Sequence, residues 1–177
     1  MKRITISSLS PSAFERAAKE IREYADHLSD QCRTFVDQLA QIGLDSALTN
    51  ARMSPLGNTV SFQIKNYDMA DTAIAILIGT GADTQTENYP VANTLLMIEF
   101  GAGIVLNDEQ NPFASEFGMG VGTFPDQKHA FDPGGWFYPD ETGVWHHTYG
   151  TKATMPMYHA DTDTLQSIEK VARAVFK

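Results

Sequence analysis

Cysteine is almost absent from this chain, which has Cys32 alone among its 177 residues. A single cysteine forms neither an internal disulfide nor a cysteine-based metal cluster, which favours assembly in the reducing cytoplasm. Cys32 falls within an amphipathic pattern, where we expect it to pack as a small hydrophobic residue.

Long hydrophobic runs are also missing. The run AIAILIG is far shorter than the roughly 20 apolar residues that span a bilayer as a helix. The first residues, MKRITISSLSPSAF, include basic side chains but not the continuous apolar segment of a signal peptide. We therefore expect neither export by a signal peptide nor insertion into a membrane.

Positive charge is scarce, because 13 lysine and arginine residues face 22 aspartate and glutamate residues, for a net charge of −9. This charge repels a phosphate backbone, and no dense Lys/Arg cluster reverses it locally, so specific nucleic-acid binding is not expected. Apolar residues make up 42% of the chain, enough for a packed core. The length fits a single domain, residues 1–177.

Nucleotide-binding and hydrolase motifs are missing too. The segments GTGAD, FGAGIVLND and FGMGVGTF contain neither the Gly-x-Gly-x-x-Gly of a dinucleotide site nor the Gly-Lys-Ser/Thr that ends a P-loop. No serine stands in a Gly-x-Ser-x-Gly elbow. We therefore expect no cofactor and no nucleophilic catalysis.

The clearest element that is present is an apolar stripe in the N-terminal part, residues 10–52, which is predicted to be helical. At about 1.5 Å per residue, a helix over residues 10–43 reaches close to 50 Å, longer than a small domain needs. Part of the stripe is therefore expected to contact a partner chain, and the alternative is a core helix with a break. The stripe residues recur at steps of three and four: Phe14, Ala17, Ala18, Ile21, Ala25, Leu28, Cys32, Phe35, Leu39 and Ile42.

The ends of this helix have sequence signals. Ser10 before Pro11, or a capping box of Ser12 with Glu15, marks the start. Gly43 is typical of a helix end, and LDSALTNARM then predicts a second, shorter helix.

Residues 58–105 are predicted to form the sheet core. TVSFQIKN alternates apolar and polar residues, as a half-buried strand does. TAIAILIGTG has the composition of a central strand, with a helix as the alternative, and YDMAD is expected to join the two in a hairpin. NTLLMIEFGAG fits either a helix or a strand.

Residues 106–133 lose all periodicity and form an irregular insertion, which we interpret as a binding loop. Residues 134–177 are predicted to contain an aromatic hairpin, with strands at 136–138 and 144–148, and an amphipathic helix with Asp161 or Thr162 as its N-cap. Together these elements predict an α+β fold with a long N-terminal helix, a small, mainly antiparallel sheet and a C-terminal helix.

Several metal-ligating side chains occur near the C-terminus. His146 or His147, together with His159, Asp161 and Glu99, would suit a small metal-dependent hydrolase. Consecutive strand residues point to opposite faces, however, so one of the two adjacent histidines at most could join such a site. No helix-borne His-Glu-x-x-His spacing is present, so surface or interface histidines are the favoured interpretation.

Glu99 interrupts the apolar segment LLMIEFGAG. A carboxylate in such a setting requires a hydrogen-bond partner, either backbone N–H groups or Lys152. A structural acceptor is favoured over a catalytic carboxylate.

Two short motifs in this order, MIEFGAG at 97–103 and MPMYHA at 155–160, resemble those of the neck family of tailed phages, named after gene product ten of a lambdoid coliphage. The resemblance extends over the whole chain, including the long N-terminal helix, the irregular insertion and the closing helix. The chain departs from the family pattern at Ala102, where threonine is common, and in its long acidic, aromatic insertion.

The resemblance implies a non-enzymatic virion protein of the neck or tail, assembled in the host bacterial cytoplasm. It implies head-tail joining or tail completion as a homo-oligomeric ring that contacts other neck or tail proteins, without membrane or specific nucleic-acid binding. Aromatic residues and Met are typical of interface cores, and the alternative for the aromatic residues is the ordinary core of a small sheet. The exposed part of the N-terminal stripe is the other candidate surface. The interface candidates are Phe14, Ile21, Leu28, Phe35, Glu99, Phe100, Gly101, Gly103, Trp136, Tyr138, Trp145, Tyr149, Met155, Pro156 and Tyr158.

Overall fold

The computed structural model describes residues 10–69, 72–86, 89–108, 111–120, 131–139 and 142–176. The predicted α+β class is confirmed, because a long N-terminal helix and a C-terminal helix accompany antiparallel pairs of strands. Within the described ranges, no helix is both long and apolar enough to cross a bilayer.

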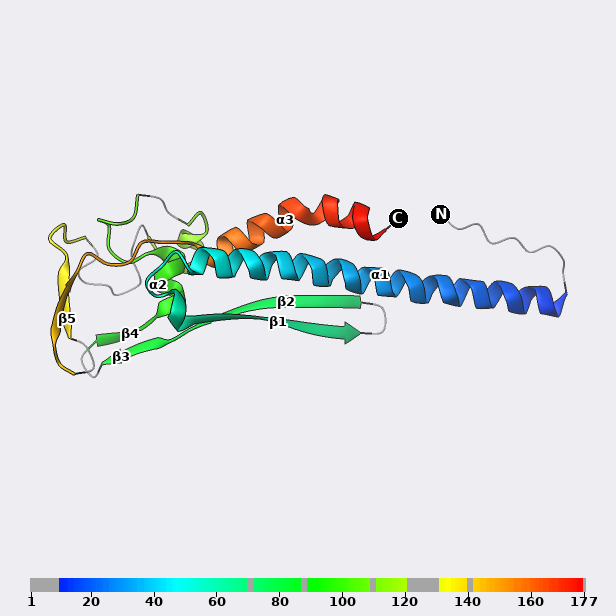
Figure 1. The fold of residues 1–177 in the computed structure, drawn as a ribbon, viewed down its shortest axis with the longest axis horizontal. Coiled ribbons are helices and arrows are strands. Elements are labelled where there is room, and N and C mark those ends of the chain that lie inside the picture. Colours follow the sequence, from blue (N-terminus) through cyan, green and yellow to red (C-terminus); the bar gives the residue numbers. More distant parts are fainter. Residues whose placement is uncertain are drawn as a thin grey trace.

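Helix α1, Pro11–Ala51, runs along the length of the molecule (Figure 1). Its 41 residues make it about 60 Å long. Ser10 is the N-cap, and its hydroxyl accepts a hydrogen bond from the N–H of Ala13 at 3.3 Å. The predicted start at Ser10 and Pro11 is confirmed, rather than the alternative at Ser12.

The predicted helix end at Gly43 is wrong, because α1 continues through this residue and includes the segment that was expected to form a second helix. Gly43 is buried where α1 meets α3, Pro156–Val175. A Cβ atom at Gly43 would lie 2.9 Å from Thr164 Oγ1. The missing side chain lets the two helices approach closely, which outweighs the low helix propensity of glycine.

Helix α3 packs antiparallel on the C-terminal part of α1. At the C-terminal end of α3, the Val175 carbonyl accepts a hydrogen bond from Gln31 Nε2 of α1 at 2.7 Å. The rings of Phe35 and Phe176 are 5.6 Å apart there. The N-terminal part of α1 continues past α3 (Figure 1). All side chains from 21 to 28 in this part are exposed.

Strands β1, Val60–Met69, and β2, Thr72–Gly81, form the expected antiparallel hairpin. The hairpin lies along α1 on the side away from α3 (Figure 1). The helical alternative for β2 is wrong, and so is its prediction as a central strand, because among the described residues it pairs with β1 alone. Ile74, Leu77 and Ile78 are half-buried, whereas Thr72, Ile76 and Thr80 are exposed, so the strand buries its apolar residues only in part.

A second strand pair was not predicted. The 3₁₀ turn η1, Gly57–Thr59, precedes β1, and β3, Asp83–Thr86, pairs with β4, Tyr89–Asn93, before helix α2, Thr94–Phe100. The Asn93 side chain caps α2 by accepting a hydrogen bond from the N–H of Leu95 at 3.0 Å. The ambiguous segment NTLLMIEF is therefore mostly helical.

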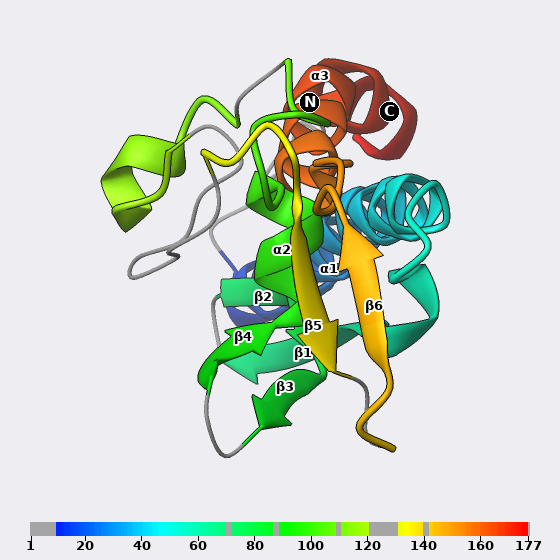
Figure 2. The ribbon, with the colours of Figure 1, turned by 90° about the vertical axis from the view of Figure 1, so that its left-hand side faces the viewer.

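Strands β5, Trp136–Pro139, and β6, Trp145–Thr148, form the predicted aromatic hairpin, with Trp136 opposite Thr148. This hairpin lies at the end of the molecule opposite the projecting part of α1, in front of α2 in the end-on view (Figures 1 and 2). Helix α3 begins at Pro156, so the predicted N-cap at Asp161 or Thr162 is wrong, since both residues lie inside the helix.

Candidate functional site

The Glu99 side chain connects α2 with the irregular insertion and with the start of α3. Its side chain is only 6% exposed. One oxygen, Oε2, accepts a hydrogen bond from the Met157 N–H at 2.8 Å, and the other, Oε1, accepts from the Tyr158 N–H at 3.0 Å and from Asn111 Nδ2 at 2.7 Å. The favoured interpretation of Glu99 as a structural acceptor of backbone donors fits these contacts. Lys152 Nζ lies instead 3.8 Å from Asp108 Oδ1.

Burial raises the pKa of Glu99 above its usual range. The N–H groups of Met157 and Tyr158, the nearby His159 and the Asn111 amide lower the pKa but do not cancel this effect. The carboxylate also lies at the N-terminus of α3, where the helix dipole favours negative charge. Glu99 therefore supplies from α2 the cap that α3 lacks in its own sequence.

The residue before α3 is constrained by α2 as well. Met155 is the N-cap position of α3, has a positive φ of 49°, and makes no capping hydrogen bond through its side chain. The backbone N–H groups of Thr154 and Met155 both donate to the Ile98 carbonyl, at 2.7 and 3.0 Å. Pro156 at the first helical position and Ile98 are fully buried. These contacts fix the direction in which α3 starts.

We call the contact region between α2 and the start of α3 the junction. The glycines that follow α2 also belong to it. Ala102 and Thr151 exchange two backbone hydrogen bonds, of 2.8 and 2.7 Å. Gly101 and Gly103 have φ of 79° and 81°, a region that favours glycine. A side chain at Gly101 would overlap Asn107, and a Cβ atom at Gly103 would lie 2.9 Å from the Trp136 ring.

Two buried asparagines in the irregular insertion were missed by the sequence analysis. Asn107 donates to the carbonyls of Gly103 (2.7 Å) and Thr151 (3.0 Å), and its oxygen accepts from the Ala153 N–H at 2.7 Å. Asn111 binds Glu99. Asparagine is common in exposed turns, so its position in a Gly- and Pro-rich segment gave no signal of burial.

The first part of the insertion is therefore packed against α2 and the start of α3. It contains the 3₁₀ turn η2, Ala114–Phe117, and two aromatic contacts, Phe100 with Phe117 at 5.7 Å and Phe113 with Tyr158 at 6.0 Å between ring centroids. Residues 109–110 and 121–130 of the insertion lie outside the described residues. Its interpretation as a binding loop stays a prediction.

The aromatic hairpin exposes most of its side chains. Trp136 is half-buried against Gly103 and attaches the hairpin to the junction. Phe137, Tyr138, Trp145 and Tyr149 are exposed, and Trp145 is 60% exposed. We call these four residues the aromatic patch. A cluster of exposed large aromatic side chains is typical of a protein–protein interface.

The apolar stripe of α1 is divided between core and surface. Phe35 is half-buried against Phe176, whereas Phe14, Ile21 and Leu28 are exposed. Apart from Phe35, the structure thus separates the predicted interface candidates into two exposed groups, at α1 and at the aromatic patch, and one internal group. The internal group, whose members contact each other around the junction or are half-buried beside it, is Glu99, Phe100, Gly101, Gly103, Trp136, Met155, Pro156 and Tyr158.

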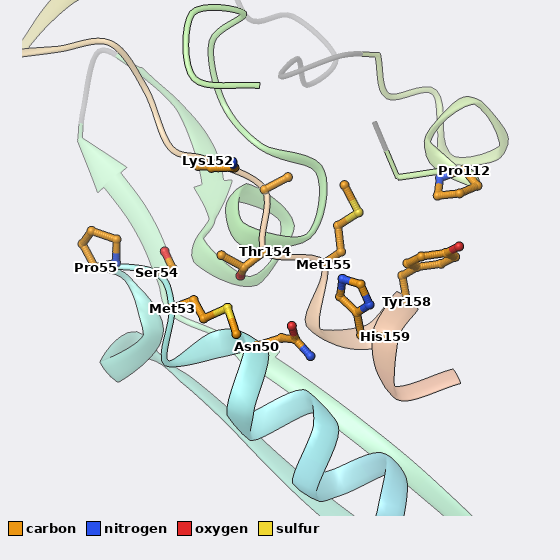
Figure 3. A pocket seen from close by; sticks show the side chains of 11 residues that line it. Asn50, Met53, Ser54, Pro55, Pro112, Lys152, Thr154, Met155, Tyr158 and His159 are labelled. Carbon is orange, nitrogen blue, oxygen red and sulfur yellow. The ribbon is translucent and has the colours of Figure 1, made fainter. Parts of the chain in front are cut away.

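A cavity of about 640 Å³ lies between the end of α1 and the start of α3 (Figure 3). The Asn50, Met53 and His159 side chains line it, together with the exposed Lys152. Thr154 Oγ1 is buried beside it without a hydrogen-bond partner among the described residues. The lining combines these polar groups and those of Ser54 and Tyr158 with methionine and proline.

Of the residues of the hydrolase alternative, the structure brings Glu99 and His159 close together at the start of α3, and the two histidines of β6 lie on the separate aromatic hairpin. His146 and His147 lie on β6, where His146 contacts Tyr138 and His147 contacts Phe137, and His147 Nε2 lies 2.8 Å from the Gly134 carbonyl oxygen. Asp161 is exposed on α3. Among the described residues, no three His, Cys, Asp or Glu side chains are grouped so as to hold a metal ion.

We compared the chain with protein-family models, with curated proteins and with solved structures, and none of the three comparisons gave a match.

Proposed function

We propose that this chain is a virion structural protein of a tailed phage or prophage, acting in head-tail joining or tail completion as an oligomeric ring. It works by assembly with copies of itself and with other neck or tail proteins, in the virion, and not as an enzyme. The observation that carries the proposal is the direct contact between the two motifs of the resemblance.

These motifs, at 97–103 and 155–160, meet through Glu99, which accepts hydrogen bonds from Met157 and Tyr158. A shared role of both motifs in one structural junction would explain why the resemblance is carried by these residues and not by an exposed site. The buried residues of the junction hold α2, α3 and the aromatic hairpin in one arrangement.

The distribution of apolar surface supports a ring. Heterologous contacts that close by rotation need two different adhesive surfaces on each subunit. Phe14, Ile21 and Leu28 form one such surface on the projecting part of α1, and the aromatic patch forms the other at the opposite end (Figure 1). The net charge of −9 would suit a lumen through which DNA slides without sticking, because like charges repel.

A particle-complementation assay tests the proposal. Purified protein is added to phage particles produced without it, and infectivity or joined particles are counted. Trp145→Ala is expected to abolish most complementation while leaving the thermal unfolding midpoint within a few degrees, because Trp145 is exposed. Lys170→Ala, on the exposed side of α3, is the matched control and is expected to complement as the natural chain does.

Native mass spectrometry before and after chelator treatment distinguishes this proposal from the hydrolase alternative. A metal-free chain that adds to particles supports the neck assignment. One metal ion per chain that is lost on chelation and in His159→Ala would contradict the neck assignment and support the hydrolase.

A further inference from the structure

Most of the apolar stripe on the projecting part of α1 is exposed in the part of the chain that the structure describes. Residues 11–28 lie beyond the end of α3 and form a helical segment about 27 Å long (Figure 1). Ile21 is 56% exposed, and Phe14 and Leu28 are also exposed. A helix with an apolar face is stabilised mainly by packing that face, so this segment has the properties of one half of an interface.

The spacing of the stripe is that of a coiled coil. Phe14, Ala18, Ile21, Ala25 and Leu28 follow one another at alternating steps of four and three residues. Large and small residues alternate along the seam, because the two alanines occupy one heptad position and the bulky residues occupy the other. The pattern continues through Cys32 and Phe35 into the part covered by α3.

This alternation distinguishes the two directions in which a second copy could pair. In a parallel pair, each residue meets its own copy, so layers of two alanines leave voids between layers of two bulky residues. In an antiparallel pair, Phe14 lies opposite the partner's Ala25, and Ala18 lies opposite the partner's Ile21. Each of these layers then combines a large with a small side chain, which fills the seam evenly.

Charges beside the seam favour the same arrangement. Ala13 and Ala17 lie on one side of the seam of Phe14, Ala18, Ile21, Ala25 and Leu28 and are buried, whereas Glu15 and Arg22 lie on its other side and are exposed. In the antiparallel register, Glu15 lies beside the partner's Arg22, and the two-fold symmetry repeats this pair. In a parallel pair, Glu15 of one copy does not lie beside Arg22 of the other copy.

The elements around α1 leave room for this pairing. In this pairing the segment 11–28 of one copy overlies the segment 11–28 of the other, so neither copy reaches α3 of its partner. A cavity of about 590 Å³ between α1 and the hairpin tip is lined by Ala25, Leu28 and Met69. It lies next to the position at which the partner's Phe14 arrives.

We propose that the free protein is a two-fold symmetric dimer in which the projecting parts of α1 pair antiparallel. The role of the dimer in assembly rests on the proposed function, since the ring would use the same stripe for its subunit contacts. The dimer then covers one adhesive surface until the subunit docks on a particle, which prevents rings from forming away from the particle.

Sedimentation equilibrium of the purified full chain tests the dimer. We expect a reversible dimer at micromolar concentration and a loss of affinity of more than about tenfold in Ile21→Asp, whose site is exposed in the subunit. Ile168→Asp, at an exposed apolar residue of α3 outside the stripe, is the matched control and should leave the dimer unchanged. Circular dichroism checks that both variants keep their fold.

A charge exchange tests the predicted neighbours. Glu15→Arg or Arg22→Glu alone should weaken the dimer roughly threefold to tenfold, because each creates like charges across the seam, and the combined variant should restore it. Independent additive losses would overturn the register.

Disulfide trapping tests the direction of pairing in a Cys32→Ser background. Phe14→Cys mixed with Ala25→Cys should give a mixed disulfide, and neither variant should cross-link with itself, because like residues are about 16 Å apart along the seam in the antiparallel pair. Self-cross-linking of Ala25→Cys, or a monomer at tens of micromolar, would overturn the proposal.

A monomer that still complements particles would leave the neck assignment standing, and a dimer that fails to complement would contradict only that assignment.

Discussion

Glu99 accepts a hydrogen bond from the Met157 N–H at 2.8 Å, across a separation of 58 residues along the chain. The contact lets a carboxylate of α2 cap the first turn of α3, whose own N-cap residue makes no side-chain capping bond. The stability of the C-terminal helix is therefore coupled to the position of α2.

Removing this carboxylate should destabilise the fold. Glu99→Ala leaves the N–H groups of Met157 and Tyr158 and the Asn111 amide without their acceptor in a buried site. We expect a loss of about 2–4 kcal/mol in the free energy of unfolding, measured by urea denaturation. Glu169→Ala, which removes an exposed ion pair with Arg173, should cost less than about 0.5 kcal/mol. Equal losses would contradict the capping role.

The raised pKa of Glu99 predicts a pH dependence of stability. A carboxyl that binds its proton more tightly in the folded chain stabilises the fold at low pH and loses that contribution as pH rises from the ordinary value of 4.5 through the folded-state pKa. The free energy of unfolding of the natural chain should therefore fall, relative to that of Glu99→Gln, as pH rises above about 4.5. A difference that stays constant or grows with pH would show that the pKa is not raised.

Close packing of α1 on α3 predicts a coupled effect at Gly43. Gly43→Ala adds a good helix former, but its Cβ atom would lie 2.9 Å from Thr164 Oγ1. In a Thr164→Ala background this obstacle is gone, and the same change should stabilise the chain by about 0.5–1 kcal/mol. A double-mutant cycle measures the coupling, which we expect to be at least about 0.5 kcal/mol. Additive effects would mean that the helices separate freely at this point.

Two glycines with nearly equal φ provide a matched test of the junction. Gly103 has a φ of 81° and lies against the Trp136 ring, whereas Gly143 has a φ of 83° and open space around its Cβ position. Gly143→Ala should cost about 1 kcal/mol from backbone strain alone. Gly103→Ala should cost about 2 kcal/mol more, with a shift in the tryptophan fluorescence, because its Cβ atom would lie 2.5 Å from the Tyr149 carbonyl oxygen and 2.9 Å from the Trp136 ring, so both must move. Similar losses for the two variants would argue against tight packing of Trp136.

The sequence periodicity predicted the elements better than their ends. The stripe of α1, the alternation of β1 and the aromatic hairpin were recognisable because each element buries one face regularly. The helix end predicted at Gly43 and the helix start predicted at Asp161, in place of Pro156, were wrong because both depend on distant segments. Helix packing explains the glycine within α1, and Glu99 replaces the local cap expected at Asp161.

The buried polar contacts could not be predicted from local sequence. Glu99 was identifiable as a carboxylate among apolar neighbours, but its donors come from α3 and the insertion. Asn107 and Asn111 stand in a segment without periodicity, and the backbone and side-chain groups that they contact are brought to them by the three-dimensional fold. Strand β3 has a polar, threonine-rich sequence and pairs only locally with β4, so it produced no recognisable pattern.

The contact between Gln31 and Val175 spans 144 residues. During translation at roughly 5–20 residues per second, α1 therefore waits roughly 7–30 s before α3 exists to cover it. Throughout that interval the face of α1 that α3 later covers, and not only the projecting part, lacks its covering helix. Neighbouring nascent chains on one polysome would present this helix to each other before either subunit has closed.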